Sequence, residues 1–287
     1  GVKHTKMEQV RIRLPEKVQW IIRKLKEQGF DAYAVGGCVR DSILGREPED
    51  WDITTSAKPE EIKQIFRRTV DTGIEHGTVT VLAEKEGFEV TTYRIDGEYE
   101  DGRHPKEVWF TGKLAEDLKR RDFTINAMAY NDEDGLCDLF GGQEDLQKGI
   151  IRCVGDARER FTEDALRILR AVRFSAQLGF SMEEKTKEAA GALAGTLVKI
   201  SAERIQSELV KLLVSPHPEE MLTAWELGIT KVILPEFDRM METPQNNPHH
   251  IYSVGDHTIH AVETIAPNPI LRLTMLLHDI AKPETRS

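Results

Sequence analysis

Hydrophobic positions in the first third of the chain recur first at helical and then at strand spacing. Residues 15–29 carry apolar side chains on one helical face and end at Gly29, which predicts an amphipathic helix. An apolar run over 32–35 predicts a short buried strand, and a second helical pattern over 38–44 stops at a glycine. The elements predicted next are a helix over 58–66 and strands over 69–71, 78–83 and 88–93. We therefore expect a mixed, mainly antiparallel sheet with helices packed against it.

The pattern changes character in the second half of the chain. Strand-like runs continue over 108–110, 136–139 and 150–154, and helical spacing dominates after Gly155. Residues 163–174 fit one helix with an apolar stripe, and Ser201 caps another helix that runs to Leu213. The predicted fold class is α+β, with an N-terminal mixed-sheet head, an all-α neck and a partial helical body. The expected domain bounds are 1–154, 155–215 and 216–287.

Two glycines and two aspartates follow the first predicted strand. Gly36 and Gly37 lie between a strand and a helix, where backbone N–H groups suit phosphate oxygens, although a simple turn is the alternative. Asp50 and Asp52 stand two positions apart at the start of β-type residues, so both carboxylates face one side. Like charges that close favour a hard cation such as Mg²⁺, and a solvated acidic turn is the alternative. Together these features predict nucleotide chemistry.

Further polar residues stand among core positions in the next predicted elements. Glu89 lies in a predicted strand, where it either faces solvent or completes a set of three carboxylates for two-metal phosphoryl transfer. Arg121 offers a planar donor fork to phosphate, and Asp122 and Asn126 can hold ribose hydroxyls. The alternative for Asp122 is a helix cap. This group predicts contacts to a nucleotide.

The helical pattern over 163–174 carries a polar face beside its apolar stripe. Asp164 and Arg167 stand three positions apart, which predicts that they share one helix face. An intrahelical salt bridge is the plain interpretation, worth only a few tenths of a kcal/mol. Alternatively, the carboxylate accepts from the exocyclic amino group of cytosine or adenine while the guanidinium donates to the ring acceptors. Arg170 and Arg173 extend this side as candidates for a basic strip.

Three motifs in this order resemble a known family. The motifs are 36–41 (GGCVRD) with 50–56 (DWDITTS), then 120–122 (RRD), then 163–167 (EDALR). The chain from about 32 to 174 resembles the class II tRNA nucleotidyltransferase and bacterial poly(A) polymerase family, most of all its CCA-adding members. The resemblance implies a polymerase β-like head.

The roles implied by the resemblance fall on residues already singled out. It implies catalysis by Asp50, Asp52 and Glu89, with Mg²⁺ as cofactor on the two aspartates. It assigns the nucleotide to a larger set, which is Gly36, Gly37, Arg40, Arg121, Asp122, Asn126, Asp164 and Arg167. Their position on the same helix adds Arg170 and Arg173 to the expected nucleotide-binding residues. The polar loop before residue 108 resembles the family's flexible loop, whose presence implies addition of the terminal A.

The expected activity is addition of CCA to tRNA 3′ ends from CTP and ATP without a nucleic-acid template, with no DNA or membrane partner. A poly(A) polymerase of the same family is the nearest alternative, and an RNA-binding module with a silent site is another. His257, His278 and Asp279 indicate an HD-type metal site and hence a phosphohydrolase as a third alternative. Such a site lacks its downstream carboxylate here, so we expect the chain to be part of a longer protein, and a vestigial HD unit is the alternative.

Composition modifies this interpretation in three ways. The 287 residues, 39% hydrophobic and 31% charged, allow about two domains. The formal net charge of −10 disfavours an RNA partner unless basic residues gather locally. The three cysteines lack metal or redox spacing, which predicts reduced thiols in a cytoplasmic protein, and no apolar run approaches the ~20 residues that span a bilayer.

Overall fold

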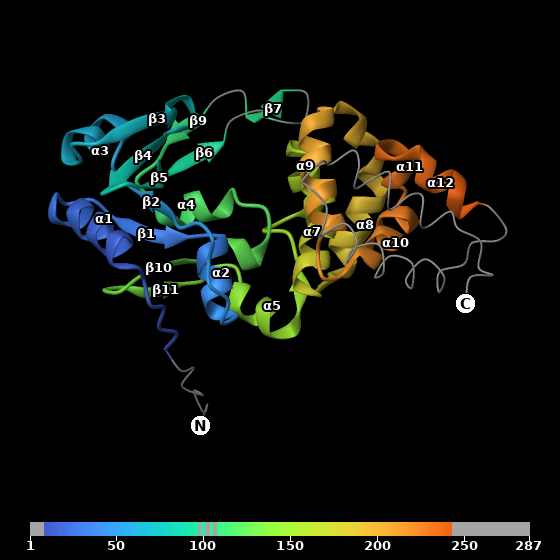
Figure 1. The fold of residues 1–287 in the computed structure, drawn as a ribbon, viewed down its shortest axis with the longest axis horizontal. Helices are drawn as coiled ribbons and strands as arrows, with labels where there is room; N and C mark the ends of the chain where they lie inside the picture. The colour runs from blue at the N-terminus through green and yellow to red at the C-terminus, as the bar shows by residue number, and fades with distance from the viewer. Residues whose placement is uncertain (1–8, 97–98, 101–103, 106–107, 243–287) are drawn as a thin grey trace. The chain divides into compact units, whose positions relative to one another are not determined.

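The computed structural model of this chain describes residues 9–96, 99–100, 104–105 and 108–242. Apart from a short excursion near residues 99–104, the chain divides into two compact units, one ending at Lys148 and the other beginning at Gly149. Figure 1 shows the order of their helices and strands. The first unit contains the sheet and the second is almost entirely helical.

Seven strands of the first unit form one sheet in the order β11-β10-β1-β2-β5-β4-β3. All neighbours are antiparallel except β2 and β5, which run parallel with Ile53 opposite Val90. The strands are β1 (Ala32–Val35), β2 (Asp52–Thr55), β3 (Thr69–Gly73), β4 (Thr78–Ala83), β5 (Glu86–Thr92), β10 (Ala129–Asn131) and β11 (Gly135–Cys137). The prediction of a mixed, mainly antiparallel sheet is confirmed.

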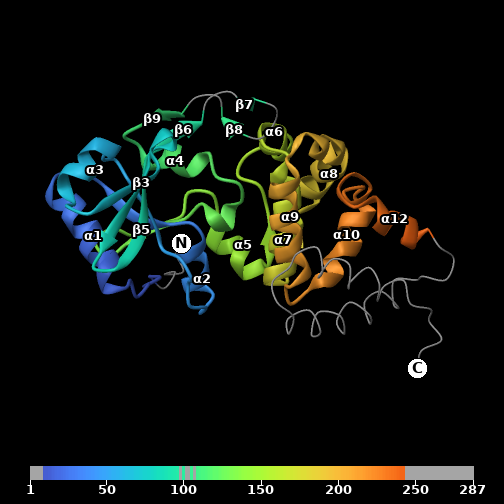
Figure 2. The ribbon, with the colours of Figure 1, turned by 45° about the horizontal axis from the view of Figure 1, so that its top comes forward.

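Side-chain alternation gives the two faces of this sheet different partners. The helices α1 (Glu16–Glu27) and α3 (Pro59–Ile65) pack against the sheet and against each other (Figure 2). Val35 instead contacts Leu118 of α4 (Leu114–Lys119) in a separate apolar cluster. Asp52 is the partner of Val35 across the β1–β2 ladder, and directly paired residues share a face, so Asp52 lies on the α4 side.

The remaining elements of this unit connect or flank the sheet. A two-stranded ribbon pairs Ile95 with Trp109 and marks the two ends of the predicted flexible loop, most of which lies outside the described residues. The connecting elements are α2 (Gly37–Ile43), η1 (Ile74–His76), β6 (Arg94–Asp96), β9 (Val108–Phe110), η2 (Thr124–Asn126) and α5 (Gly142–Lys148). The two-residue strands β7 (Tyr99–Glu100) and β8 (His104–Pro105) lie at the excursion near residues 99–104.

Gly142, the first residue of α5, lies where no larger residue fits. A Cβ added there would stand 2.4 Å from the carbonyl oxygen of Thr124 and 2.9 Å from the side chain of Met128. We expect Gly142→Ala to lower the free energy of unfolding by about 1–3 kcal/mol, because backbone would have to move. Urea denaturation measures this, with Gly112→Ala as the control because open space surrounds that glycine. Equal stability of the two variants would contradict the packing described.

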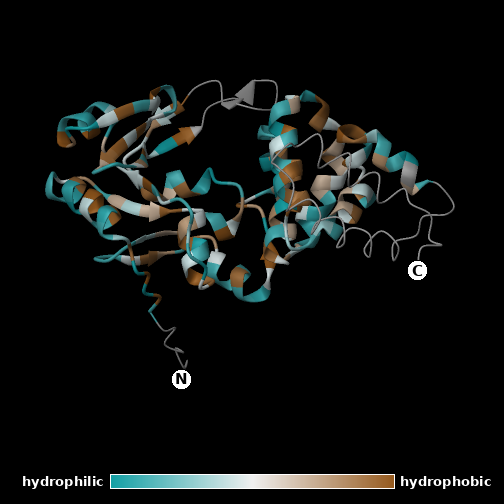
Figure 3. Ribbon diagram, viewed as in Figure 1, coloured by the Kyte–Doolittle hydropathy of each residue, from teal (hydrophilic) through white to brown (hydrophobic). Residues whose placement is uncertain are grey.

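The second unit is built from seven helices and two short 3₁₀ segments among its described residues. Hydrophobic and hydrophilic residues alternate along these helices (Figure 3). In α7, Leu166, Leu169 and Val172 form the predicted apolar stripe and are buried. The elements are α6 (Ala157–Glu163), α7 (Leu166–Leu178), α8 (Glu184–Leu193), η3 (Ala194–Lys199), α9 (Ala202–Leu213), η4 (Pro218–Glu220), α10 (Met221–Glu226), α11 (Thr230–Ile233) and α12 (Pro235–Met241).

Two details of the second unit differ from the sequence predictions. The strand expected over 150–154 is the shorter β12 (Ile150–Ile151), and it pairs in parallel with β13 (Ser181–Met182) rather than with the head sheet. The single helix predicted over 163–174 is wrong at its start, because α6 ends at Glu163 and Asp164 is extended with φ −148° and ψ 105°. The carboxylate of Asp164 accepts the Leu166 N–H at 3.1 Å and so favours a new helix start.

Two further predictions concern the rest of the chain. Among the helices that the structure describes, none combines the length and the apolar character needed to cross a bilayer. His257, His278 and Asp279, which indicated an HD-type metal site, lie outside the described residues.

Candidate active site

The predicted catalytic carboxylates lie at one end of the parallel strand pair. Asp52 begins β2, and Glu89 lies in β5 one position before Val90, the partner of Ile53. Ile53 and Val90 are fully buried on the other face, so strand alternation places Asp52 and Glu89 on a common side. Asp50 is exposed just before the strand. The sheet therefore brings the three carboxylates to one end of one face.

Electrostatic coupling supports this proximity. Although Asp52 is exposed where β2 begins, the pKa of its carboxyl group is raised from 3.8 to about 6, first because nearby protein reduces its hydration and then because Glu89 and Asp50 repel its charge. Arg121 opposes the shift by attraction. Among the described residues, no three His, Cys, Asp or Glu side chains are already gathered as a metal-binding group. The carboxylates are thus neighbours that interact through their charges.

Gly36 brings the backbone close to Arg121. It has φ 84° and ψ −136° immediately before α2, a conformation that favours glycine, and its N–H donates to the carbonyl of Met128 at 3.2 Å. A Cβ at this position would stand 3.6 Å from Nη1 of Arg121. The strand, the two glycines and the helix predicted from the sequence are all present. The guanidinium of Arg121 therefore lies beside the glycine turn.

A chain of hydrogen bonds joins the glycine motif to the Arg-Arg-Asp motif. Arg40 donates from Nη1 to Oδ1 of Asn126 at 2.7 Å, and Asn126 donates from Nδ2 to Oδ1 of Asp122 at 3.2 Å. The same Asp122 oxygen accepts the Phe123 N–H at 2.7 Å, and the N-cap of the following 3₁₀ helix is Phe123, so Asp122 is not a helix cap. Asp122 and Asn126 are buried, at 9% and 7% exposure. The two motifs thus form one polar network, although Arg40 and Asn126 are 86 positions apart in the sequence.

Asp117 and Thr54 belong to this site although no motif singled them out. Asp117 is fully buried and pairs with Arg120 and Arg121 at 3.3 and 3.1 Å. Its i,i+3 and i,i+4 spacing to two arginines is a signal that could have identified it on a helix. Thr54 is buried two positions after Asp52 and donates to the same carboxylate. These contacts connect the arginines to the strand that carries Asp52.

The predicted base-reading residues lie in the second unit and have protein partners. The Asp164 carboxylate accepts from Nη2 and Nη1 of Arg204 at 2.9 and 3.4 Å. Arg167 donates from Nη1 to Glu163 at 2.7 Å and to the carbonyl of Arg160 at 3.1 Å. Asp164 precedes α7 and Arg167 lies in its first turn, so the expectation that both lie on one helix face is wrong. Asp164 and Arg167 therefore lie on either side of the start of α7.

The basic strip expected on α7 is not formed by Arg173. Its Nε and Nη2 donate to the two carboxylate oxygens of Glu208 in α9 at 2.6 and 3.2 Å. The guanidinium also stands 3.9 Å from the ring centroid of Phe174, and Arg173 is only 8% exposed. Arg170 is half-buried, 5.6 Å from the same ring. Arg173 therefore fastens α7 to α9 instead of presenting charge to solvent.

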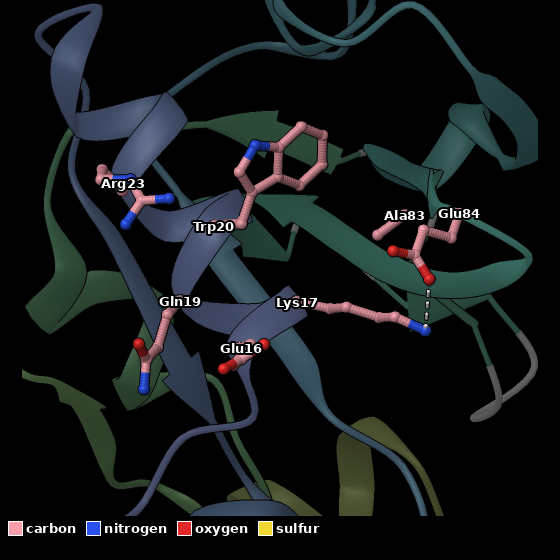
Figure 4. Close-up of a pocket in the computed structure, with 7 residues that line it drawn as sticks. All are labelled: Glu16, Lys17, Gln19, Trp20, Arg23, Ala83 and Glu84. Atoms are coloured by element: carbon pink, nitrogen blue, oxygen red, sulfur yellow. Dashed lines mark ion pairs between the residues drawn. The ribbon is translucent and has the colours of Figure 1, made fainter.

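A hollow of about 470 Å³ elsewhere in the first unit contains none of the predicted site residues. Lys17, Trp20 and Arg23 of α1 line it together with Glu84 at the β4–β5 turn (Figure 4). An ion pair of 3.7 Å joins Lys17 and Glu84 across it. The polar network beside β2, and not this hollow, holds the motif residues.

Comparison with known proteins gives consistent matches. The family model described as "Poly A polymerase head domain" matches residues 32–152, and "Probable RNA and SrmB- binding site of polymerase A" matches 179–241. A CCA-adding enzyme of Leuconostoc mesenteroides is 54% identical over 204 residues, which make up 71% of this chain and 51% of that protein. The chain thus spans about half the length of the curated relatives it matches.

Solved structures agree with these matches. The Bacillus stearothermophilus CCA-adding enzyme in complex with CTP matches with a TM-score of 0.71 and 34% identity, over 93% of this chain and 76% of that one. The Thermotoga maritima CCA-adding enzyme complexed with tRNA matches with a TM-score of 0.71 and 25% identity, over 94% of this chain and 67% of that one.

Proposed function

The chain belongs to the poly A polymerase head-domain family, and we propose that it acts within that family as a tRNA nucleotidyltransferase that adds CCA to tRNA 3′ ends from CTP and ATP without a nucleic-acid template. Family membership agrees with the motifs and with the matched CCA-adding enzymes. The partners in this proposal are tRNA and the two nucleotides, in the cytoplasm. The activity is proposed for the protein of which this chain covers the head and the following helices.

The observation that carries the proposal is that acidic side chains and a basic side chain lie close together in the first unit. The carboxylate of Asp52 interacts electrostatically with Glu89, with Asp50 and with Arg121. Arg121 lies beside the Gly36 turn, where a triphosphate could approach the backbone closely. Carboxylates next to a phosphate-binding cation are what metal-dependent nucleotidyl transfer requires.

The donor set fits magnesium. Asp50 and Asp52 would hold the ion with carboxylate oxygens, the ligands that Mg²⁺ prefers, and Glu89 adds a further oxygen donor nearby. The repulsion that raises the pKa of Asp52 is the kind that a divalent cation relieves. When bound, Mg²⁺ would favour ionisation of the attacking hydroxyl and neutralise charge on the phosphates.

The chain's own residues bind and orient the reactants in this proposal. Arg40 and Arg121 hold the triphosphate, and the buried Asn126, itself bonded to Asp122, keeps Arg40 in place. The tRNA 3′ oxygen then bonds to the α-phosphorus, the bond from this phosphorus to the β-phosphate bridge breaks, and pyrophosphate leaves with the charge. Holding the nucleotide in line is the main contribution of these side chains.

Base choice is proposed to depend on Asp164 and Arg167. A carboxylate offers about four acceptor positions, so the contacts that Asp164 makes to Arg204 leave capacity for an exocyclic amino group. Cytosine and adenine carry such a group beside a ring acceptor, whereas uracil and guanine present a carbonyl there. This chemistry supports acceptance of CTP and ATP and rejection of UTP and GTP.

The test is incorporation of labelled nucleotides on a tRNA that lacks its terminal CCA. We expect the full-length protein to add two C residues and one A in the presence of CTP, ATP and Mg²⁺, and to stop there. UTP and GTP should be incorporated at rates lower by at least ~10²-fold. Their bases present a carbonyl where Asp164 and Arg167 need an amino group beside a ring acceptor. Products resolved at single-nucleotide length give the result.

Poly(A) polymerase is the second candidate, because both matching family models are described by that activity. The same assay separates the two functions. Use of ATP without CTP, with tails that continue to grow, would contradict CCA addition and establish the alternative. Failure to incorporate any nucleotide would contradict both.

A further inference from the structure

Asp117 is a fully buried carboxylate with donors on both oxygens. Oδ2 accepts from Nη2 of Arg121 and from Oγ1 of Thr54, each at 3.1 Å. Oδ1 accepts from Nε of Arg120 at 3.3 Å and from the backbone N–H of Arg94 at 3.2 Å. The donors come from β2, from β6 and from the residues after α4. One side chain therefore joins three separate segments of the head.

The charge on Asp117 is stable in this position. Burial alone would raise its pKa, but the charges of Arg121 and Arg120 outweigh burial and hold the pKa below its ordinary value. A buried carboxylate that is ionised and fully hydrogen-bonded fixes the orientation of the guanidinium groups that donate to it. The fixed partner of greatest interest is Arg121.

Arg121 is held at the point where the predicted triphosphate site meets the predicted metal site. Its Nη1 is the atom nearest to a Cβ built on Gly36, and its charge acts on Asp52. Thr54 stands two positions after Asp52 in the same strand, so both side chains lie on the same face. Oδ2 of Asp117 thus accepts one hydrogen bond from the arginine and another from the strand that carries Asp52.

We propose that Asp117 is a positioning residue for nucleotide binding, which holds Arg121 and the Asp52 strand in one frame so that the guanidinium meets the triphosphate without rearrangement. The inference rests on the proposed function, because it takes Arg121 as the triphosphate ligand. Asp117 itself does not touch the nucleotide. Pre-orientation lowers the cost of immobilising a long side chain on binding.

A double-mutant cycle on nucleotide binding tests this role. Asp117→Asn in the full-length protein is expected to weaken CTP binding, measured by isothermal titration calorimetry, by roughly tenfold to a hundredfold. In the background of Arg121→Ala the same substitution should change the Kd by less than about threefold, because the positioned group is already absent. Equal weakening in both backgrounds would overturn the proposal.

A control on an exposed carboxylate separates positioning from the loss of a negative charge elsewhere in the unit. Asp134 also has a lowered pKa, accepts a hydrogen bond from Tyr33 at 2.8 Å and lies in the same unit, outside the site. Asp134→Asn removes the same charge and should leave the Kd for CTP unchanged. In steady-state assays, Asp117→Asn should raise the KM for CTP while kcat stays within a few-fold. A loss confined to kcat, or shared by the control, would contradict positioning.

A second variant keeps the test decisive if Asp117→Asn does not fold. Thr54→Val keeps the side-chain shape and removes only one donor to Asp117. It should weaken CTP binding several-fold with Arg121 present and leave it unchanged with Arg121→Ala. Binding at the wild-type level in the first background would overturn the proposal.

Binding and turnover also distinguish this inference from the proposed function. A wild-type protein that binds CTP without transferring it would contradict nucleotidyl transfer, while the cycle on Kd would still be measurable. Normal CCA addition together with an unaltered Kd in Asp117→Asn would preserve the proposed function and overturn the role of Asp117.

Discussion

Replacing Asp52 by asparagine is expected to lower the rate of nucleotide incorporation by on the order of 10³-fold or more, because the substitution removes a charged ligand of the proposed metal and keeps the shape of the side chain. Incorporation of CTP on CCA-less tRNA under single-turnover conditions measures the effect. The Kd for CTP without metal should change little, because Arg40 and Arg121 remain.

The same substitution should not destabilise the protein. Asp52 has a folded-state pKa of about 6 against an ordinary value of 3.8, so its stabilising contribution exists at low pH and is lost as pH rises through about 6. At pH 7 the ionised carboxylate is therefore unfavourable, and Asp52→Asn should have a Tm equal to or above the wild type. The control Asp71→Asn, on the outer strand β3, should keep full activity. Activity of Asp52→Asn within tenfold of wild type would exclude the catalytic role.

Breaking the ion pair between Arg173 and Glu208 should have the largest effect on stability. Both residues are nearly buried, at 8% and 5% exposure, and two hydrogen bonds join them. Glu208→Gln leaves a buried guanidinium without its counter-charge and should lower the free energy of unfolding by about 3–5 kcal/mol. Urea denaturation followed by circular dichroism reports the loss in the helical unit.

Two further variants show whether the charge, and not the packing, is responsible. The double variant Arg173→Met, Glu208→Leu should recover most of the lost stability, because apolar side chains of similar size replace a desolvated pair. Glu236→Gln breaks an exposed pair with Arg239, whose side chains are 55% and 70% exposed, and should cost under about 0.5 kcal/mol. Similar losses in Glu208→Gln and Glu236→Gln would contradict a buried pair.

Local patterns predicted most of the elements but not every partner between them. The strands of the head alternate clearly, and Gly29 and Gly45 end helices close to where the spacing stops. β2 pairs in parallel with β5. Which strand becomes the neighbour of β2 depends on the packing of the whole sheet, so the sequence of either strand alone does not predict it. The same reason explains why β12 joins β13.

The site was predicted as a set of motifs, and the structure adds the contacts that connect them. Gly36, Arg40, Arg121 and Asn126 could be found because their residue types stand out among apolar neighbours. The break at Asp164 could not, because Asp caps a helix as readily as it occupies its first turn. Arg173 looked like a surface residue because its partner Glu208 lies 35 positions away.

The placement of β1 inside the head sheet, between β10 and β2, has a consequence for biosynthesis. Ala34 of β1 pairs with Tyr130 of β10, 96 positions further along the chain, while β2 flanks it on the other side. A growing polypeptide must therefore expose one edge of β1 until the later strand leaves the ribosome. Because Asn126 and Arg121 arrive with that late segment, the head gains its proposed nucleotide-binding surface only as its last sheet strands emerge.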